Sequence, residues 1–381
     1  MKPYVCQQRL PRAPSILALE GVGMTVASLL LLASFMSCRG GSVAAPETNS
    51  SKTLRSVAES RGVVIGAAAS AGYLEDAKYA QILGSEFGQL QPENDMKFVF
   101  IHPRTDSDPN PYDFTATDKV VAFAHAHKML VRGHTLVWHN QLPDWVKSDR
   151  LTPAQLSAIL QGHISTLVRR YGASVYAWDV VNEAFNDDGS LGDTIWYNNP
   201  GIGFAEQGSQ YIAQALVWAH EANPKAELFY NDMGAEIVNK KSDAIFAMAR
   251  DLKQHGAPLD GIGLEMHVDL SFDEANTLAS LTRNLKRFAD LGLIIHITEL
   301  DVRLADASTG ALAAQADLYR KITGICLDNL SCRVIQLWGV TDRYSWIPWF
   351  FPGYDSALLW DANYQKKPAY RSVQQALLAR P

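Results

Sequence analysis

The sequence lacks the features that would suit it to nucleic acid or to an anionic membrane surface. It has 34 Lys and Arg against 40 Asp and Glu, a formal net charge of −6 and no long basic run. Because such partners are bound through clustered positive charge, the composition argues against both and favours a neutral ligand. Nine Trp residues could stack on such a ligand, although aromatic rings are also ordinary core material.

Cysteine is scarce, with four residues in the whole chain. Cys6 and Cys38 lie near the N-terminus, whereas Cys326 and Cys332 are separated by five residues in the last quarter of the chain. Two cysteines without a second pair make a poor zinc site. In an oxidising compartment, the natural interpretation of this spacing is a small loop closed by a disulfide.

An uncharged, mostly apolar segment lies near the N-terminus. Residues 21–36 carry no charge and follow Lys2, Arg9 and Arg12. Sixteen residues are short for a membrane-spanning helix but typical of the apolar region of a signal peptide. We therefore predict a signal peptide over residues 1–38 and export of the mature chain to the extracellular space or the cell envelope.

Two processing routes remain open at the end of this segment. Phe35-Met36-Ser37-Cys38 resembles an imperfect bacterial lipobox, in which Cys38 would carry a lipid and provide the chain's one link to a membrane. The alternative is ordinary cleavage near residues 42–44, which would discard Cys38. Residues 39–52, rich in Gly, Ser, Pro and Asn, predict a flexible tether. No further linker follows, so residues 53–381 are expected to form one domain. We also expect the protein to be a monomer.

This domain alternates short apolar runs with amphipathic helical stretches. Thr152, Pro153 and Gln155 provide an N-cap, a first-turn proline and a capping-box partner for a helix that Gly172 ends. Eight strand-like runs begin near Val63, Phe87, Leu130, Val175, Glu227, Gly261, Ile295 and Arg333. Continuous apolar runs separated by room for a crossover helix are typical of parallel strands buried on both faces. The pattern predicts an α/β protein with a closed (β/α)8 TIM barrel.

Polar residues end nearly every one of these runs, where a buried strand should avoid them. They are Glu93, Asn94, Trp138, His139, Asn182, Glu183, Asn231, Asp232, Glu265, His267, Glu299, Asp301, Thr341 and Asp342. Because the carboxyl ends of barrel strands converge on one face, this ring of residues predicts the active site. The histidines near these strands, His134, His139, His267 and His296, show no HExxH spacing. We therefore expect neither a metal nor another cofactor.

Glu183 and Glu299 end the fourth and seventh predicted strands and could meet across the barrel mouth. Hydrolysis of a glycosidic bond needs two carboxyl groups, about 5 Å apart for retention of configuration and about 6.5–9.5 Å apart for inversion. The pair therefore points to glycoside hydrolysis.

The sequence resembles glycoside hydrolase family 10, the retaining endo-β-1,4-xylanases, from about Thr53 to the C-terminus. The matching segments are Glu93 to Lys97 (ENDMK), Arg132 to His139 (RGHTLVWH), Trp178 to Ala184 (WDVVNEA), Ile297 to Val302 (ITELDV) and Trp338 to Asp342 (WGVTD). Cys326 and Cys332 also match a cysteine pair often seen before the last strand of the family. The resemblance implies cleavage of internal linkages in xylan or xylo-oligosaccharides through a covalent glycosyl-enzyme.

The resemblance also implies roles for individual residues. Glu183 matches the acid/base, Glu299 the nucleophile and Asn182 the residue that holds the sugar's 2-hydroxyl. The remaining matches to substrate-binding positions are Glu93, Asn94, Lys97, His134, Trp138, Gln141, His267, Trp338 and Trp346.

The chain departs from the family pattern at three positions. Glu265 stands where the family usually has Gln, Met233 where Tyr is common, and Phe98 where Trp is frequent. We expect Glu265, together with Asp301, to tune the ionisation of neighbouring groups. Two alternative functions remain at this point: a non-catalytic xylan- or oligosaccharide-binding protein on the same fold, and a β-1,4-glucanase. The presence of both Glu183 and Glu299 argues against the binding protein.

Overall fold

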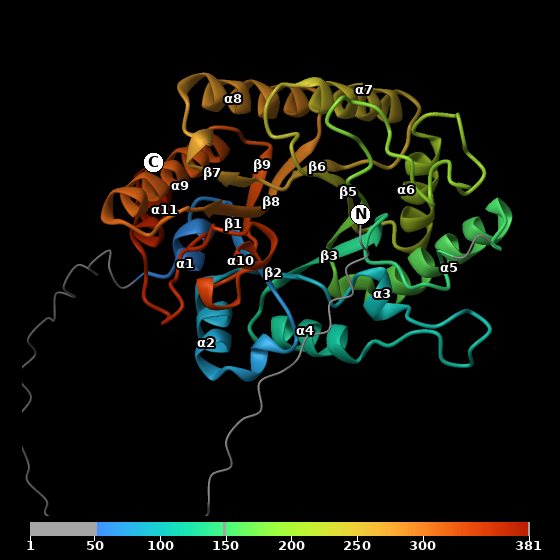
Figure 1. Ribbon diagram of the computed structural model, residues 1–381, viewed down its shortest axis with the longest axis horizontal. Coiled ribbons are helices and arrows are strands. Elements are labelled where there is room, and N and C mark those ends of the chain that lie inside the picture. The colour runs from blue at the N-terminus through green and yellow to red at the C-terminus, as the bar shows by residue number, and fades with distance from the viewer. Residues whose placement is uncertain (1–51, 148–149, 380–381) are drawn as a thin grey trace, which may run out of the picture. The chain divides into compact units, whose positions relative to one another are not determined.

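The computed structural model describes residues 52–147 and 150–379 (Figure 1). The predicted signal peptide, Cys38 and the tether up to residue 51 lie outside the described residues. Within the part of the chain that is described, no helix is long and apolar enough to cross a membrane.

A closed barrel of eight parallel strands forms the centre of the domain, as the sequence predicts. The strands pair in the order β6-β5-β4-β3-β2-β1-β9-β8, and pairing of β6 with β8 closes the ring. Each predicted strand start lies within two residues of the observed one. The strands are β1 Val64–Ala69, β2 Gln89–Pro92, β3 Leu130–Val137, β4 Ala177–Asn182, β5 Glu227–Asp232, β6 Gly261–Leu264, β8 Ile294–Arg303 and β9 Cys332–Leu337.

A ninth strand, β7 (His267–Asp269), was not predicted. It pairs in parallel with the second half of β8, where His267 lies opposite Asp301. It therefore extends the wall at the carboxyl end of β8, beyond the barrel ring.

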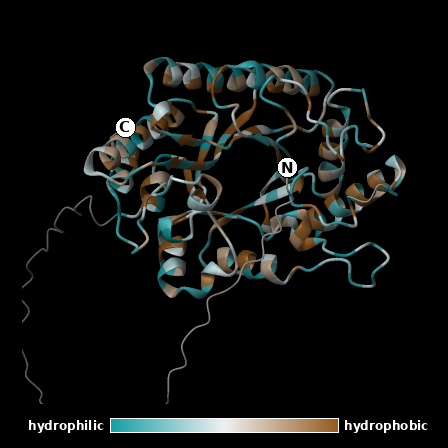
Figure 2. Cartoon of the chain, viewed as in Figure 1, coloured by the Kyte–Doolittle hydropathy of each residue, from teal (hydrophilic) through white to brown (hydrophobic). Residues whose placement is uncertain are grey.

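Helices surround the barrel in the alternating pattern expected of β/α units (Figure 1). The α-helices are α1 Leu54–Glu59, α2 Ala77–Glu86, α3 Phe98–Ile101, α4 Thr115–Ala126, α5 Pro153–Tyr171, α6 Gln210–Ala222, α7 Lys240–Gln254, α8 Ala275–Asp290, α9 Thr309–Leu327, α10 Ile347–Phe350 and α11 Pro368–Leu378. Short 3-10 turns cover Tyr73–Glu75, Gly172–Ser174, Leu270–Phe272 and Asp342–Tyr344. Figure 2 shows hydrophobic residues in the strands and both kinds of residue on the helices, as expected when each helix buries one side.

The capping signals of α5 are confirmed. The Gln155 backbone N–H donates to the Thr152 hydroxyl, and the Thr152 backbone N–H donates to Gln155 Oε1 at 2.9 Å. The helix ends at Gly172, whose φ of +44° suits a residue without a side chain. Leu156, Leu160 and other residues at helical spacing are buried against the barrel.

A buried polar layer inside the barrel prepares the site above it. Arg132 of β3 is fully buried, forms an ion pair with Asp179 of β4 and contacts His296 of β8 at 2.7 Å. Asp179 also bonds His134 Nδ1 at 3.1 Å. The buried carboxylate of Asp179 thus compensates the charge of Arg132 and also fixes the orientation of the His134 ring.

The predicted disulfide between Cys326 and Cys332 is confirmed, and its Cα atoms lie 5.3 Å apart. It joins the end of α9 to the first residue of β9. This is the amino end of the strand, opposite the face on which the predicted active-site residues lie, so the bond has a structural role.

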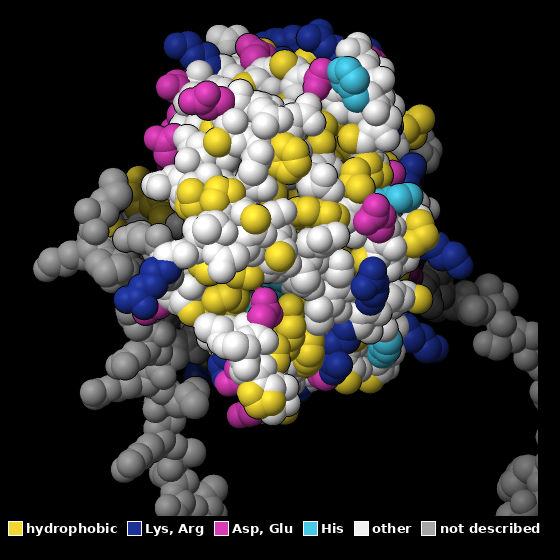
Figure 3. All heavy atoms as spheres, turned by 90° about the vertical axis from the view of Figure 1, so that its right-hand side faces the viewer, with side chains coloured by type: hydrophobic (Ala, Val, Ile, Leu, Met, Phe, Trp, Pro, Cys, Tyr) yellow, Lys and Arg dark blue, Asp and Glu magenta, His cyan; other side chains and the backbone are white. Residues whose placement is uncertain are grey.

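Figure 3 shows one face of the molecule, on the side of α5 and α6. Side chains of both charges are interspersed there with hydrophobic and uncharged ones.

Candidate active site

The two glutamates occupy different positions relative to the ends of their strands. Glu299 lies within β8, whereas Glu183 directly follows the last residue of β4. Glu183 has a left-handed backbone with φ of +53°, and its backbone N–H donates to the Asn231 carbonyl at 2.9 Å. A non-glycine residue in this conformation has to be held by its surroundings. The hydrogen bond to Asn231 of β5 helps to stabilise this conformation of Glu183.

Glu183 is half-buried and is contacted by neutral donors. Trp138 Nε1 donates to its Oε2 at 2.9 Å, and Asn182 Nδ2 donates to its Oε1 at 3.2 Å. These bonds fix the direction of the carboxyl group while leaving it partly accessible to water. This environment suits a group that must exchange protons.

Glu299 is more deeply buried, with 4% of its surface exposed. Asn231 Nδ2 donates to its Oε1 at 3.0 Å, and His267 Nε2 donates to its Oε2 at 3.2 Å. His134 Nδ1 lies 3.9 Å from Oε1. Burial raises the pKa of Glu299, but the positive charge of His134 and the hydrogen bond and charge of His267 outweigh it and lower the pKa. Glu299 is therefore an anion at neutral pH.

His267 lies between two carboxylates. Its Nδ1 contacts Asp301 Oδ2 at 3.0 Å, and its Nε2 contacts Glu299. Burial lowers the pKa of His267, but Asp301 and then Glu299 raise it to about 10. Both ring nitrogens are therefore protonated and donate. Asp301 also accepts from Trp346 Nε1 at 2.8 Å. A continuous series of hydrogen bonds therefore runs from Trp346 through Asp301 and His267 to Glu299.

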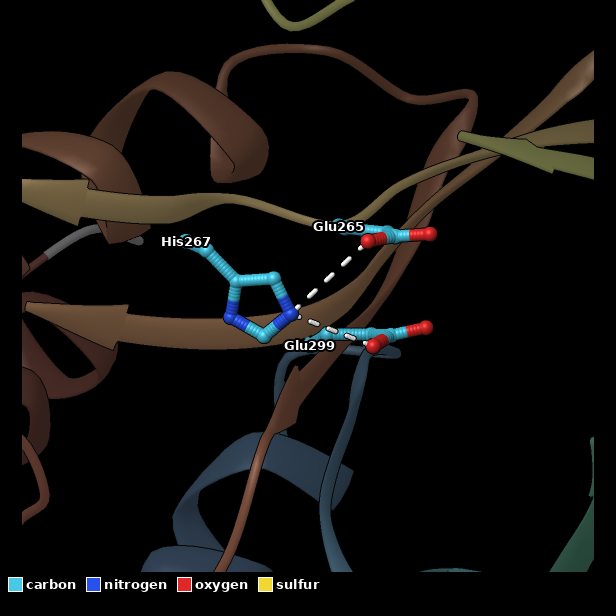
Figure 4. Close-up of side chains that lie close together, drawn as sticks. All are labelled: Glu265, His267 and Glu299. Atoms are coloured by element: carbon cyan, nitrogen blue, oxygen red, sulfur yellow. Dashed lines mark hydrogen bonds and ion pairs between the residues drawn. The ribbon is translucent and has the colours of Figure 1, made fainter. Parts of the chain in front are cut away.

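Glu265 stands beside Glu299 with only 1% of its surface exposed. Its Oε1 accepts from Asn231 Nδ2 at 3.1 Å, and its Oε2 lies 3.7 Å from His267 Nε2 (Figure 4). Burial first, and then the charges of Glu299 and Glu183, raise the pKa of Glu265 well above its ordinary value. It is therefore protonated at a pH where an ordinary glutamate would be charged.

Among the described residues, Glu265, His267 and Glu299 are the group whose ligand atoms lie close enough together to hold a metal ion. The chemistry of His267 argues against that use. Its two nitrogens donate to Asp301 and Glu299, and the cationic ring has no lone pair to offer a metal.

Asn231 connects the two glutamates through side-chain amides. Its Nδ2 bonds Glu299 and also Asn182 Oδ1 at 2.7 Å, and Asn182 in turn bonds Glu183. Its own Oδ1 accepts from the Thr298 hydroxyl at 2.7 Å, which fixes which end of the amide faces the carboxylates. Both catalytic candidates therefore belong to one hydrogen-bonded network.

Lys97 lies in the segment between β2 and α3, directly before the first residue of α3. Its ammonium contacts Asn94 Oδ1 at 3.2 Å and lies 4.9 Å from the centre of the Trp138 ring and 5.7 Å from that of Trp338. Asn94 donates to Glu93 at 3.4 Å, and burial raises the pKa of Glu93 to about 7 although Lys97 opposes it. Polar groups that could bind sugar hydroxyls are thus backed by aromatic rings.

The rings of Trp338 and Trp346 approach the histidines. Trp338 lies edge-on to His134 at 5.4 Å and to His267 at 6.0 Å, and Trp346 lies 4.7 Å from His267. Gln141 has a left-handed backbone with φ of +49° and a buried Oε1 that has no hydrogen-bond partner among the described residues.

Every substrate-binding residue predicted from the sequence, except Gln141, contacts either another residue of that set or one of the two catalytic glutamates. Sequence reasoning assigned no role to Asp179 and treated Asn231 only as a polar strand end. Asp179 lies within a matching segment and interrupts the apolar residues of β4, and this was its signal. Arg132 and His134 lie in another matching segment, but their pairing with Asp179 is a contact between strands that the sequence does not reveal.

Comparison with known proteins gives consistent results. The family described as "Glycosyl hydrolase family 10" matches residues 53–376. Endo-1,4-beta-xylanase B of Thermotoga neapolitana is 43% identical over 329 residues, which cover 85% of this chain and 91% of that protein. Endo-1,4-beta-xylanase A of Phanerodontia chrysosporium is 38% identical over 330 residues, covering 86% and 77%. The crystal structure of native xylanase 10B from Thermotoga maritima is similar with a TM-score of 0.80 at 44% identity, covering 86% of this chain and 98% of that one.

Proposed function

We propose that this chain, which belongs to glycosyl hydrolase family 10 and is an endo-1,4-β-xylanase, uses Glu299 as the nucleophile and Glu183 as the acid/base. The observation that carries the assignment is the difference between their surroundings. Glu299 is buried against the His267 cation, whereas Glu183 is half-exposed among neutral donors. A fixed anion suits covalent attack, and a partly accessible carboxyl suits proton exchange with water.

In the first step, a Glu299 oxygen attacks the anomeric carbon and the bond to the leaving sugar breaks. Glu183 gives its proton to the departing oxygen. Trp138 and Asn182 hold the Glu183 carboxyl in place for this transfer. The products are a shortened xylan chain and a glycosyl ester of Glu299.

In the second step, water replaces the enzyme at the anomeric carbon. Glu183, now an anion, takes a proton from the water as the oxygen attacks, and the ester bond to Glu299 breaks. Two displacements restore the original configuration, so the product retains it. Glu299 regains its charge beside His267, which holds it ready for the next cycle.

We assign sugar binding to two groups of side chains. Hydrogen-bonding groups come from Glu93, Asn94, Lys97 and His134. Asn182 reaches the 2-hydroxyl of the sugar under attack. The rings of Trp138, Trp338 and Trp346 offer apolar surface and crowd the position where a hexose would carry its CH₂OH group. This crowding favours xylose over glucose. The assigned chemistry uses these side chains and water, with no cofactor.

The sequence alone supports two further proposals. Residues 1–38 act as an export signal, with Cys38 as the lipidated first residue of the mature protein or as part of the discarded peptide. The exported enzyme works as a monomer outside the cytoplasm, in the medium or attached to the cell envelope.

Trapping the intermediate tests the catalytic assignment. The full chain is incubated with 2,4-dinitrophenyl 2-deoxy-2-fluoro-β-xylobioside, digested and mapped by mass spectrometry. We expect the label on Glu299, no label in Glu299→Gln, and a persistent label in Glu183→Gln because water is no longer activated. A label on another residue, or normal xylan hydrolysis by Glu299→Gln, would contradict the assignment. Release of reducing ends from carboxymethyl-cellulose at the rate seen with xylan would favour the glucanase.

A further inference from the structure

The carboxyl groups of Glu265 and Glu299 lie side by side. One donor group faces an oxygen of each on one side, because Asn231 Nδ2 lies 3.1 Å from Glu265 Oε1 and 3.0 Å from Glu299 Oε1. On the other side His267 Nε2 lies 3.7 Å from Glu265 Oε2 and 3.2 Å from Glu299 Oε2 (Figure 4). The two acids thus share both of these donors.

The donors do not supply enough hydrogens for two carboxylates. The Asn231 amide has two hydrogens but faces three acceptors, because Asn182 Oδ1 lies 2.7 Å away. His267 Nε2 has one hydrogen, and its distance to Glu299 is the shorter. A buried acceptor without a donor is costly, and a proton on Glu265 would turn one acceptor into a donor.

Charge balance leads to the same conclusion. His267 already faces the two carboxylates of Glu299 and Asp301, so a charged Glu265 would be a third anion on a single cation. The ionisable groups that face or influence Glu265 come from several elements. The acids are Glu299 and Asp301 of β8, Glu183 after β4, Asp232 of β5 and Glu236 after it, and the cations are His267 of β7, Lys97 after β2 and Lys241 of α7.

We propose that Glu265 takes part in the reaction as a neutral carboxylic acid, and that a sugar enters the site beside Glu299 only while Glu265 keeps its proton. The neutral group has the shape of the Gln that the family usually carries and can likewise donate one hydrogen bond. Glu265 is therefore a positioning residue, acting through Glu299 and the bound sugar. The inference rests on the roles proposed above for Glu183 and Glu299.

The sugar requires this state because it removes water from the site. Only 1% of the surface of Glu265 is exposed in the free enzyme, so its anion has little contact with water there, and a neutral sugar that covers the site offers no compensating charge. Binding therefore favours the protonated form, and the affinity falls as the pH rises through the ionisation of Glu265. The raised pKa of Glu265, caused by burial and then by Glu299 and Glu183, places this ionisation above that of an ordinary glutamate.

The test must separate Glu265 from the acid/base. The full chain carrying Glu183→Gln is mixed with 2,4-dinitrophenyl β-xylobioside, whose leaving group departs without protonation. Because water is poorly activated in this variant, the intermediate accumulates and the burst of dinitrophenolate reports the first step alone. Its second-order rate constant is measured between pH 4 and 9. The same series is recorded for Glu183→Gln with Glu265→Gln.

The expected result is a rate constant that falls up to tenfold per pH unit at alkaline pH in Glu183→Gln and stays level when Glu265→Gln is added. Glu183→Gln with Glu236→Gln is the matched control. Glu236 is another buried acid, and its Oε1 accepts from the backbone N–H groups of Gly234 and Met266, a role that Gln can keep. This control should retain the alkaline fall.

The same alkaline fall with and without Glu265→Gln would overturn the inference, as would a level profile in Glu183→Gln alone. An absent burst would overturn the roles of Glu183 and Glu299 and this inference with them, so the two failures are distinguishable. Calorimetry provides a measurement that needs no change at Glu265. Xylotriose binding to Glu183→Gln above the midpoint of the fall should take up a proton, seen as a heat that depends on the buffer, and no uptake would overturn the inference.

Discussion

Asp301 is the residue that most strongly sets the charge of His267, and so of the nucleophile's environment. Its carboxylate is fully buried and accepts from His267 Nδ1 at 3.0 Å and from Trp346 Nε1 at 2.8 Å. Burial lowers the pKa of His267, and Asp301 is the largest of the opposing influences that raise it from 6.5 to about 10. At 1.36 kcal/mol per pH unit, this difference corresponds to roughly 5 kcal/mol in favour of the imidazolium.

Asp301→Asn removes the charge and keeps the shape and one acceptor oxygen. If the charge supplies about half of the stabilisation, the imidazolium loses roughly 2 kcal/mol, more than one pH unit. His267 then loses its proton more than one pH unit lower than in the parent, and above that pH Glu299 loses a hydrogen bond and a charge that lower its pKa. An NMR titration of the His267 ring nitrogens should show this lower midpoint, whereas the acidic limb of kcat/KM for nitrophenyl β-xylobioside should stay in place, because His267 is protonated there in both proteins. If the His267 midpoints of variant and parent are equal, the reasoning is wrong.

Stability provides a second measurement on Asp301→Asn. The folded-state pKa of His267 lies above its unfolded value, so its contribution to stability is fully present below pH 6.5 and is lost as the pH rises through about 10. Thermal unfolding should show the variant less stable than the parent near pH 6, with the difference narrowing toward pH 10. A gap that does not change with pH would indicate a steric effect of the substitution.

Three further changes test other parts of the structure. Glu265→Gln removes a buried acid whose raised pKa makes folding less favourable as the pH rises above its ordinary value, so thermal unfolding between pH 4 and 8 should show the variant gaining up to about 1.4 kcal/mol per pH unit on the parent. Cys326→Ser opens the loop to Cys332 and should lower the free energy of unfolding by about 2 kcal/mol in denaturant titrations, with xylan hydrolysis at room temperature unchanged. Trp349 of α10 is 62% exposed and contacts Phe350, which lies against Trp346 at 4.8 Å. Trp349→Ala should raise KM for polymeric xylan by roughly two- to tenfold and leave KM for nitrophenyl β-xylobioside unchanged, since only a long chain reaches this ring.

The barrel could be predicted because its signals are local. Apolar runs such as the one beginning at Leu130 are continuous, and the capping box of Thr152 and Gln155 is contained in four residues. β7 was missed for the opposite reason. Its three residues, beginning at His267, form a strand only because β8 runs past the barrel ring and offers them a partner.

The members of the site were predictable, but their ionisation was not. Motif and strand position indicated Glu265, His267 and Glu299. Neither the charge of His267 between two carboxylates nor the three acceptors that face Asn231 could be predicted from motifs or strand positions. These properties depend on distances between residues of four strands. Met233, which replaces a common Tyr, is 38% exposed and has no contact that explains the change.

The chemical difference between the two glutamates follows from where each sits along its strand. Glu299 lies inside β8, between the residues that pair with β6 and those that pair with β7, so side chains from neighbouring strands surround it and 4% of its surface is exposed. A buried anion needs charged partners, and β7 supplies one through His267. Glu183 lies one residue beyond β4, where the left-handed backbone ends the strand and where Trp138 and Asn182 bond its carboxyl group. The position of each glutamate relative to the end of its strand thus accounts for the difference in burial and charge that allows two identical side chains to perform different chemistry.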